Sequence, residues 1–328
     1  MAVKKTLGLL AHLLGFVAIY IAAGLMFALA ERDTSNTAYE IFRTKALHAD
    51  QADSSRRILL VGGSNVIYGY RSEVLEQSLH IPTTNMAINS EGGDPIAMRE
   101  LSLSMARDGD IVVYSSIAFW NLRSIDTASA KDLLHQAGLD PATDLRKRLK
   151  DLVSRYWLMA PRQQTLASAL PRLYRRYVSK EPTEQFKDYN EYGDWKACPT
   201  SHHPSPQGYT PPPPTVALVD ALRDYQQRLR EKGATLVLDI SWLYVHADDS
   251  SRWLAEYQRN FQVLKQNFVV TTRALDDVLV SNGLLFCDSE HHLVDAGALL
   301  RSQRLATFLA ATLAAHPRQL TITKVHSI

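Results

Sequence analysis

Short apolar runs alternate with segments of helical periodicity along much of this chain, and few folds accommodate such an alternation. The runs are ILLVGG (58–63), TTNMAI (83–88), DIVVYSS (110–116), ATLVLDIS (234–241) and LLFCD (284–288). Helical segments are predicted at 72–80, 95–107, 215–232, 250–267 and 296–315. Apolar strands separated by helices are typical of a parallel sheet covered on both faces. We therefore predict an α/β domain with a central parallel sheet over residues 56–315, followed by a tail at 316–328.

The alternation breaks between residues 121 and 214, which we interpret as an irregular helical insertion in the sheet domain. This stretch ends in HHPSPQGYTPPPP, and its four consecutive prolines exclude a helix or a central strand there. A group of aromatic residues lies near its end: Tyr189, Tyr192, Trp195 and Tyr209. Packing within the domain and stacking on sugar rings both explain such a group.

Residues 6–30 contain no Asp, Glu, Lys or Arg. Because about 20 apolar residues span a bilayer as a helix, we predict a transmembrane anchor at 1–30. Residues 31–55 are polar, and we interpret them as a linker with room for one short helix. Lys4 and Lys5 precede the apolar run, so the N-terminus is expected in the cytoplasm and the remainder outside, most simply in the periplasm of a bacterium. The alternative is a signal peptide cleaved after Ala30, although its apolar region would be unusually long.

The chain holds only two cysteines, Cys198 and Cys287, and has a net charge of +2. So small a charge gives no reason to expect a nucleic-acid partner. Two cysteines offer no zinc-like spacing, and we expect neither a metal nor a cofactor. Outside the cytoplasm the pair can form a disulfide, but sequence spacing leaves two free thiols equally open.

Ser64 stands directly after the first predicted strand, in ILLVGGSNVIYGY (58–70). Ligands of parallel α/β sheets bind at the carboxyl ends of the strands. Gly62 and Gly63 allow a sharp turn and a close backbone approach. The segment matches neither a phosphate-binding glycine loop nor the G-x-S-x-G elbow. Taken alone, Ser64 fits a structural turn or a nucleophile.

The C-terminal stretch CDSEHHLVDAG (287–297) supplies a base and an acid for that serine. Asp288 closes a predicted strand and His292 follows four residues later. A carboxylate beside a histidine orients the imidazole and stabilises its charged form. Since these residues and Ser64 end strands of one predicted sheet, we predict a triad of Ser64, His292 and Asp288, with His291 as the alternative base.

The segments ILLVGGSN, NMAINSEGG, DIVVYSS and CDSEHHLVDAG together resemble the SGNH (GDSL-like) hydrolase superfamily. The resemblance implies a three-layer α/β sandwich with a serine nucleophile after the first strand. It also implies a catalytic Asp and His close together near the C-terminus, where His292 begins an H-L-x-x-x-G stretch. The spacing of four residues between Asp288 and His292 exceeds the usual three.

The resemblance also implies oxyanion donors, namely the Ser64 N–H with groups at Gly63, Asn89 and Asn121. The sequence departs from the family pattern at these places. Gly63 replaces the Asp of GDS, and Ala87 occupies the position that aligns with a donor glycine. Asn121 lies two residues beyond the expected asparagine.

One anchor joined to one SGNH-like domain resembles the anchored proteins that assist O-acylation of exported polymers, as in alginate acetylation and teichoic acid D-alanylation. That resemblance implies a multi-spanning, membrane-bound O-acyltransferase as acyl supplier and a polysaccharide as acceptor. We therefore expect a periplasmic O-acyltransferase on the inner membrane that transfers an acyl group, most simply acetyl. An esterase with the same triad and a non-catalytic scaffold are the alternatives.

Overall fold

The computed structural model describes residues 12, 15–16, 37–52, 54, 56–88, 95–116, 188–196, 204 and 216–315. The chain divides into two compact units, residues 1–37 with 140–184 and residues 38–139 with 185–328, and the sheet belongs to the second. Most of the predicted anchor, most of the predicted insertion and all of the tail lie outside the described residues. Within the described ranges, no helix is both long and apolar enough to cross a membrane.

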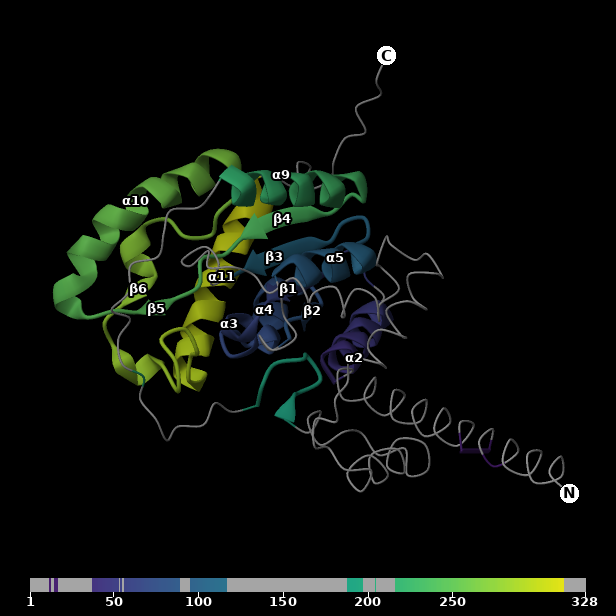
Figure 1. The fold of residues 1–328 in the computed structure, drawn as a ribbon. Coiled ribbons are helices and arrows are strands. Elements are labelled where there is room, and N and C mark those ends of the chain that lie inside the picture. Colours follow the sequence, from purple (N-terminus) through teal and green to yellow (C-terminus); the bar gives the residue numbers. More distant parts are fainter. Residues whose placement is uncertain are drawn as a thin grey trace, which may run out of the picture. The chain divides into compact units, whose positions relative to one another are not determined.

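Four parallel strands form the central sheet in the order β2-β1-β3-β4 (Figure 1). Their bounds are β1 Ile58–Gly62, β2 Thr83–Asn85, β3 Ile111–Ser115 and β4 Thr235–Leu238. Every residue of β1 and β3 is buried, as expected for a parallel sheet covered on both faces. The prediction of an α/β fold with a central parallel sheet is confirmed.

Helices flank this sheet. They are α3 Ser64–Ile67, α4 Ser72–Leu79, α5 Pro95–Met105, α9 Val216–Glu231, α10 Ser250–Asn267 and α11 Asp295–Ala315. In the sheet, β2 lies on one side of β1 and β3 lies on the other. The connection from β1 to β2 and the connection from β2 to β3 therefore cross the sheet in opposite directions. Right-handed crossovers therefore place α4 and α5 on opposite faces. The direction reverses between β1 and β3, at the kind of switch point where such sheets bind ligands.

The five long predicted helices agree with α4, α5, α9, α10 and α11 to within two residues at each end. The strand predicted at 284–288 is wrong. A 3₁₀ turn, η6 Gly283–Leu285, occupies its start, and the Asn282 side chain caps this turn by accepting from the Leu284 N–H. Phe286 then forms an isolated antiparallel bridge with Leu293. The apolar run thus closes a local loop and does not extend the sheet.

Two short strands escaped prediction, β5 Leu243–Tyr244 and β6 Leu279–Val280, which pair in parallel as a separate small sheet. Two residues are too few to leave a periodic signal in the sequence.

Helix α2 (Thr37–Gln51) occupies most of the segment assigned to a linker. Ile41, Phe42 and Ala49 are buried in the same core cluster as the sheet residues. Their spacing places them on one face of the helix, and this face packs against the sheet domain. Residues 37–51 are therefore part of the packed body.

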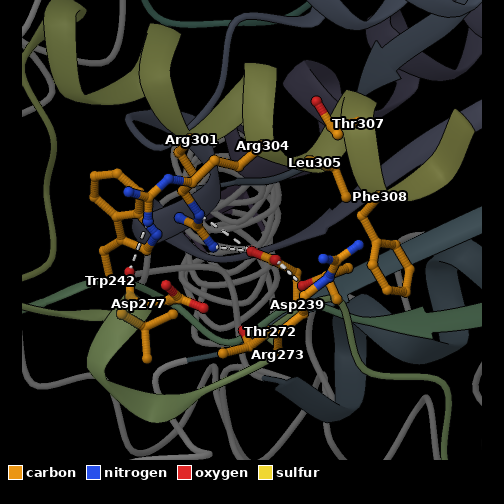
Figure 2. Close-up of a pocket in the computed structure, with 12 residues that line it drawn as sticks. Asp239, Trp242, Thr272, Arg273, Asp277, Arg301, Arg304, Leu305, Thr307 and Phe308 are labelled. Atoms are coloured by element: carbon orange, nitrogen blue, oxygen red, sulfur yellow. Dashed lines mark hydrogen bonds and ion pairs between the residues drawn. The ribbon is translucent and has the colours of Figure 1, made fainter. Parts of the chain in front are cut away.

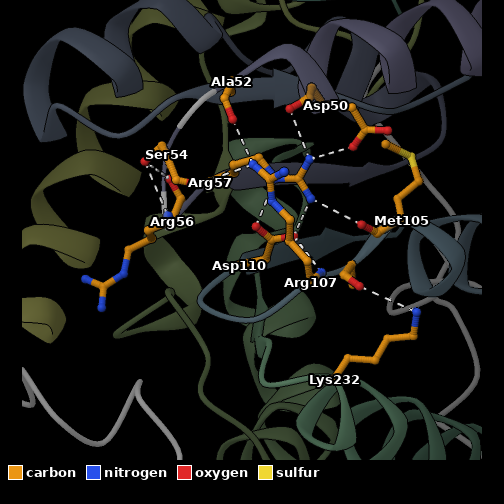
Figure 3. A network of polar contacts seen from close by, with 11 residues as sticks. Asp50, Ala52, Ser54, Arg56, Arg57, Met105, Arg107, Asp110 and Lys232 are labelled. Atoms are coloured by element: carbon orange, nitrogen blue, oxygen red, sulfur yellow. Dashed lines mark hydrogen bonds and ion pairs between the residues drawn. The ribbon is translucent and has the colours of Figure 1, made fainter.

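A buried arginine ties the N-terminal ends of β1 and β3 together (Figure 3). Arg57 is 1% exposed and donates to both carboxylate oxygens of Asp110, at 3.0 and 2.7 Å. It also donates to the Ala49 carbonyl at 3.0 Å and the Met105 carbonyl at 3.1 Å. This network fastens α2 and α5 at the edge of the sheet that lies away from Ser64.

Candidate functional site

Ser64 begins helix α3, separated from the end of β1 by Gly63 alone, and is 5% exposed. The Ser64 N–H and hydroxyl have no hydrogen-bond partner in the part of the chain that the structure describes. Gly62 is required there, because a Cβ on it would lie 2.2 Å from the Ser115 carbonyl oxygen. Gly63 has a φ of −95°, which other residues adopt, and the nearest atom to an added Cβ would be Asn65 Oδ1 at 3.6 Å, so this position does not need glycine for its φ or for space.

Asp288 and His292 form a hydrogen-bonded pair, with His292 Nδ1 2.7 Å from Asp288 Oδ1. The surrounding loop is tight, since the Cys287 N–H donates to the His292 carbonyl at 2.9 Å. Among the described residues the opposite ring nitrogen, His292 Nε2, is buried and has no hydrogen-bond partner. A buried polar atom without a partner is costly, so this nitrogen is poised for a ligand or a proton transfer.

Burial lowers the pKa of His292, and the neighbouring His291 lowers it further, while the hydrogen bond that His292 Nδ1–H donates to Asp288 opposes the shift. Desolvation disfavours the charged imidazolium, which explains the direction. His292 is therefore neutral at neutral pH, the state in which Nε2 can accept a proton.

His291, the alternative base, makes a different contact. Its Nδ1 lies 3.4 Å from Glu290 Oε1, and its ring meets that of His292 edge-on with centroids 4.7 Å apart. The hydrogen bond to His291 lowers the pKa of Glu290 despite the burial of that carboxylate. Asp288 thus pairs with His292, four residues later, and not with His291.

Tyr68 brings His292 and Ser64 into one neighbourhood. Its ring centroid lies 4.5 Å from that of His292, and its N–H donates to the Ser64 carbonyl at 3.0 Å. The serine is therefore one helical turn from a residue that touches the imidazole. No hydrogen bond joins the Ser64 hydroxyl to His292.

The expected oxyanion donors Asn89 and Asn121 lie outside the described residues. The Ala87 N–H, which aligns with the family's donor glycine, donates to Asn85 Oδ1 at 3.1 Å and is therefore occupied. Of the donors implied by the resemblance, Gly63 and Ser64 lie among the described residues, and neither backbone N–H has a hydrogen-bond partner there.

Three aromatic rings extend from His292 towards the segment 188–196. Ring centroids are 5.6 Å apart between Tyr68 and Trp195 and 5.0 Å apart between Trp195 and Tyr189. Tyr68 and Trp195 are partly exposed, whereas Tyr189 is buried. Two of the aromatic residues noted in the sequence thus lie in one row with the candidate base.

A buried carboxylate holds the segment 188–196 against the sheet. Asp194 is fully buried and accepts from the Ser72 N–H at 2.7 Å, the Ser72 hydroxyl at 2.8 Å and Asn85 Nδ2 at 2.9 Å. Gly193 beside it has a φ of +83°, and a Cβ there would lie 2.5 Å from the Asn85 carbonyl oxygen. Asp194 is not among the residues predicted for the site; the signal that the sequence offers for it is the Gly-Asp pair within an aromatic stretch.

A second buried network supports the residue after Ser64. Arg301 Nη1 donates to the Asn65 carbonyl at 3.2 Å, and Nη2 donates to Ser115 Oγ at 2.9 Å and Asp239 Oδ2 at 2.5 Å. The Tyr70 hydroxyl donates to the same Asp239 oxygen. Arg301 and Asp239 are also not among the predicted site residues. The signal for them in the sequence is Asp239, an acid directly after β4 and therefore at the carboxyl end of the sheet.

Cys287 is disulfide-bonded, and Cys198, the other cysteine of the chain, lies outside the described residues. Candidate ligand atoms of Cys287, Asp288 and His292 all lie within 4.8 Å of one another. Metals bind a thiolate, which a disulfide sulfur does not provide, so these three residues do not form a metal-binding set.

Comparison with known proteins adds little. No protein-family model matches the chain, and no curated protein matches it. The crystal structure of protein YxiM from Bacillus subtilis is similar over 80% of this chain and 58% of YxiM, with 12% identity and a TM-score of 0.36. The chain thus spans less than two thirds of YxiM, and a similarity this low carries no functional argument.

Proposed function

We propose that the protein is a serine-dependent O-acyltransferase in which Ser64 is the nucleophile, His292 the base and Asp288 its orienting acid. The observation that carries the proposal is the state of His292. Its Nδ1 is held by Asp288 at 2.7 Å, while Nε2 is buried without a partner among the described residues. This is the arrangement a general base needs before its substrate arrives.

In the first half-reaction the Ser64 oxygen attacks the carbonyl carbon of an acyl donor, and the hydroxyl proton passes to His292 Nε2. The leaving group departs with that proton, and an acyl ester remains on Ser64. The free Ser64 N–H is available to stabilise the oxyanion. In the second half-reaction an acceptor hydroxyl gives its proton to Nε2, attacks the ester and releases the Ser64 oxygen, which regains the proton.

We propose a polysaccharide as the acceptor because Tyr68 and Trp195 are partly exposed rings in line with the candidate base. Aromatic faces present apolar surface to the C–H faces of sugar rings, and their polar tips bind hydroxyls. An esterase would use the same residues with water as the acceptor. A transferase requires in addition that the acceptor outcompete water.

The membrane arrangement is part of the same proposal. An apolar run at residues 6–30 supports an inner-membrane anchor with the sheet domain in the periplasm, beside a multi-spanning O-acyltransferase that supplies the acyl group. Full-length protein should stay in the membrane fraction after a high-salt wash, and deletion of residues 2–30 should release it. Release of the full-length protein by salt alone would contradict the anchor.

Active-site labelling tests the nucleophile directly. We expect a fluorophosphonate to label the full-length protein at Ser64, and Ser64→Ala to abolish labelling. Ser104→Ala is the matched control, because Ser104 is an exposed serine on α5 whose hydroxyl donates to a carbonyl of its own helix. Labelling that survives in Ser64→Ala would overturn the assignment, and an unlabelled wild-type protein would favour the scaffold alternative.

Transfer and hydrolysis are separated with an activated acetyl ester in the presence and absence of an oligosaccharide. We expect acetylated oligosaccharide, detected by mass spectrometry, from the wild-type protein and none from Ser64→Ala. Rapid acetate release with no acetylated sugar would identify an esterase.

A further inference from the structure

Arg301, Arg304 and Asp239 are among the residues that line a pocket of about 360 Å³ (Figure 2). Helix α11, the residues that follow β4 and the stretch 271–278 enclose it. Ser64, Asp288 and His292 do not line it. Its volume falls within the range of small-molecule sites, about 300–1,000 Å³.

Two arginines that line the pocket have no acidic partner in the part of the chain that the structure describes. Arg304 Nη1 donates to the Asp277 backbone carbonyl at 3.0 Å, and its guanidinium lies 5.0 Å above the Trp242 ring. Neither Arg304 nor Arg273 forms an ion pair with any carboxylate among the described residues. Both side chains are exposed, so they are available to a ligand from solvent.

Neither acid in the lining forms an ion pair with Arg273 or Arg304, and the three arginines and two aspartates of the lining leave it a net charge of +1. Asp239 pairs with Arg301 at 2.5 Å and also accepts from the Tyr70 and Thr271 hydroxyls. Asp277 accepts from the Ala274 N–H at 3.3 Å. The pocket therefore carries a net positive charge beside the Arg301–Asp239 ion pair.

The remaining lining combines one free hydroxyl with apolar walls. Thr272 is 7% exposed, and its hydroxyl has no hydrogen-bond partner in the described part of the chain. The walls are Trp242, Val278, Leu305 and Phe308. Pockets of this composition hold an apolar body against the walls and orient it through a few polar contacts.

We propose that this pocket binds an organic oxyanion, in which a carboxylate or phosphate group contacts Arg273, Arg304 and Thr272 while an apolar body packs against Trp242 and Phe308. Guanidinium groups match both oxyanions through paired N–H donors, and such charge-assisted bonds are among the strongest in proteins. None of the proposed triad residues lines the pocket, so this binding proposal does not depend on the acyl-transfer proposal.

Titration calorimetry on the full-length protein tests the site with four probes. Benzoate and phenyl phosphate carry both an oxyanion and an apolar ring, whereas benzyl alcohol lacks the charge and inorganic phosphate lacks the ring. We expect at least one of the first two to bind saturably, and about tenfold more tightly than either of the last two. Whichever of them binds more tightly identifies the oxyanion as carboxylate or phosphate.

Variants locate the binding. Arg304→Gln and Arg273→Gln should each weaken it roughly tenfold, and higher salt should weaken it further. Arg223→Gln is the matched control, because Arg223 is an exposed arginine on α9 that is absent from the pocket lining. The proposal is overturned if neither ring-bearing probe binds below about 10 mM, or if the double variant Arg273→Gln/Arg304→Gln binds as wild type does.

Discussion

His292 is subject to two opposing influences, and their balance sets how it can act. Burial and His291 lower its pKa, whereas the carboxylate of Asp288, hydrogen-bonded to Nδ1, raises it. The net shift is downward, so the imidazole stays neutral over a wider pH range than an exposed histidine. A residue with this balance suits a base that must accept a proton at neutral pH.

The pH dependence of Ser64 labelling should report this balance. Because His292 must be neutral to accept the serine proton, the fluorophosphonate rate should fall on the acid side through a pKa below the ordinary value of about 6.5. Asp288→Asn should lower the rate roughly a thousandfold and move the acid limb to still lower pH. An acid limb above about 6.5 in the wild-type protein would contradict the role of His292.

Lys45 gives a second residue-scale prediction, this time for stability. Burial lowers the pKa of its ammonium group to about 7, although Asp194 opposes the shift. The pKa of an unfolded lysine is about 10.4. Between pH 7 and that value the unfolded chain binds more protons than the folded protein, so the free energy of unfolding rises with pH. The penalty of burying the charged lysine is complete below pH 7 and declines above it.

Replacing Lys45 with methionine should therefore raise the free energy of unfolding more at low pH than at high pH. Lys45→Met also removes the hydrogen bond from Nζ to the Ala87 carbonyl, a cost that does not depend on pH. The difference in unfolding free energy, variant minus wild type, should be larger at pH 6 than at pH 9 by roughly 2–3 kcal/mol. Urea denaturation at both pH values measures it; an unchanged difference would show that Lys45 titrates normally.

At the scale of elements, the segment 188–196 is held at the carboxyl end of β2 by polar contacts more than by regular structure. The Asn85 N–H donates to the Tyr192 carbonyl at 2.8 Å, and Asp194 accepts three hydrogen bonds. Its one β-bridge, between Tyr189 and Trp195, is internal to the segment. The position of Trp195 beside Tyr68 therefore depends on these polar contacts.

Gly193→Ala should disrupt this attachment. The positive φ and the close Asn85 carbonyl together predict a loss of about 1–3 kcal/mol in unfolding free energy and faster amide exchange at residues 188–196. Gly63→Ala is the stability control, because its φ is −95° and the nearest atom to its added Cβ is 3.6 Å away. Equal losses in the two variants would show that the segment is not anchored through Gly193.

For the whole molecule, the sheet has polar networks at both ends. Arg57 and Asp110 fasten its N-terminal edge, whereas Arg301 and Asp239 lie at the carboxyl edge near Asn65. Buried charges of this kind contribute little net stability as intact pairs, but losing one partner leaves the other unpaired in the interior. Global stability should therefore be sensitive to single substitutions at these positions.

Arg57→Met tests this at the edge away from the candidate site. Asp110 is 1% exposed, so removing its partner should cost about 3–5 kcal/mol of unfolding free energy. Arg223→Met, which breaks an exposed pair with Asp220, should cost less than about 1 kcal/mol. Similar losses in both variants would mean that the Arg57 network is dispensable.

The order of apolar runs and helical segments was sufficient to predict the parallel sheet and its five long helices, because burial on both faces and helix periodicity leave local patterns. Asp288 and His292 are only four residues apart in the chain, so their pairing could also be predicted from the sequence. Contacts between distant segments leave no such pattern: Arg301 on Asn65, Asp194 on Ser72 and the packing of α2 each join positions that only folding brings together. The tertiary structure likewise decided that the His292 imidazole lies beside Tyr68, at the end of the helix that begins with Ser64. These two residues are more than two hundred positions apart in the chain, so no local pattern in the sequence records their contact.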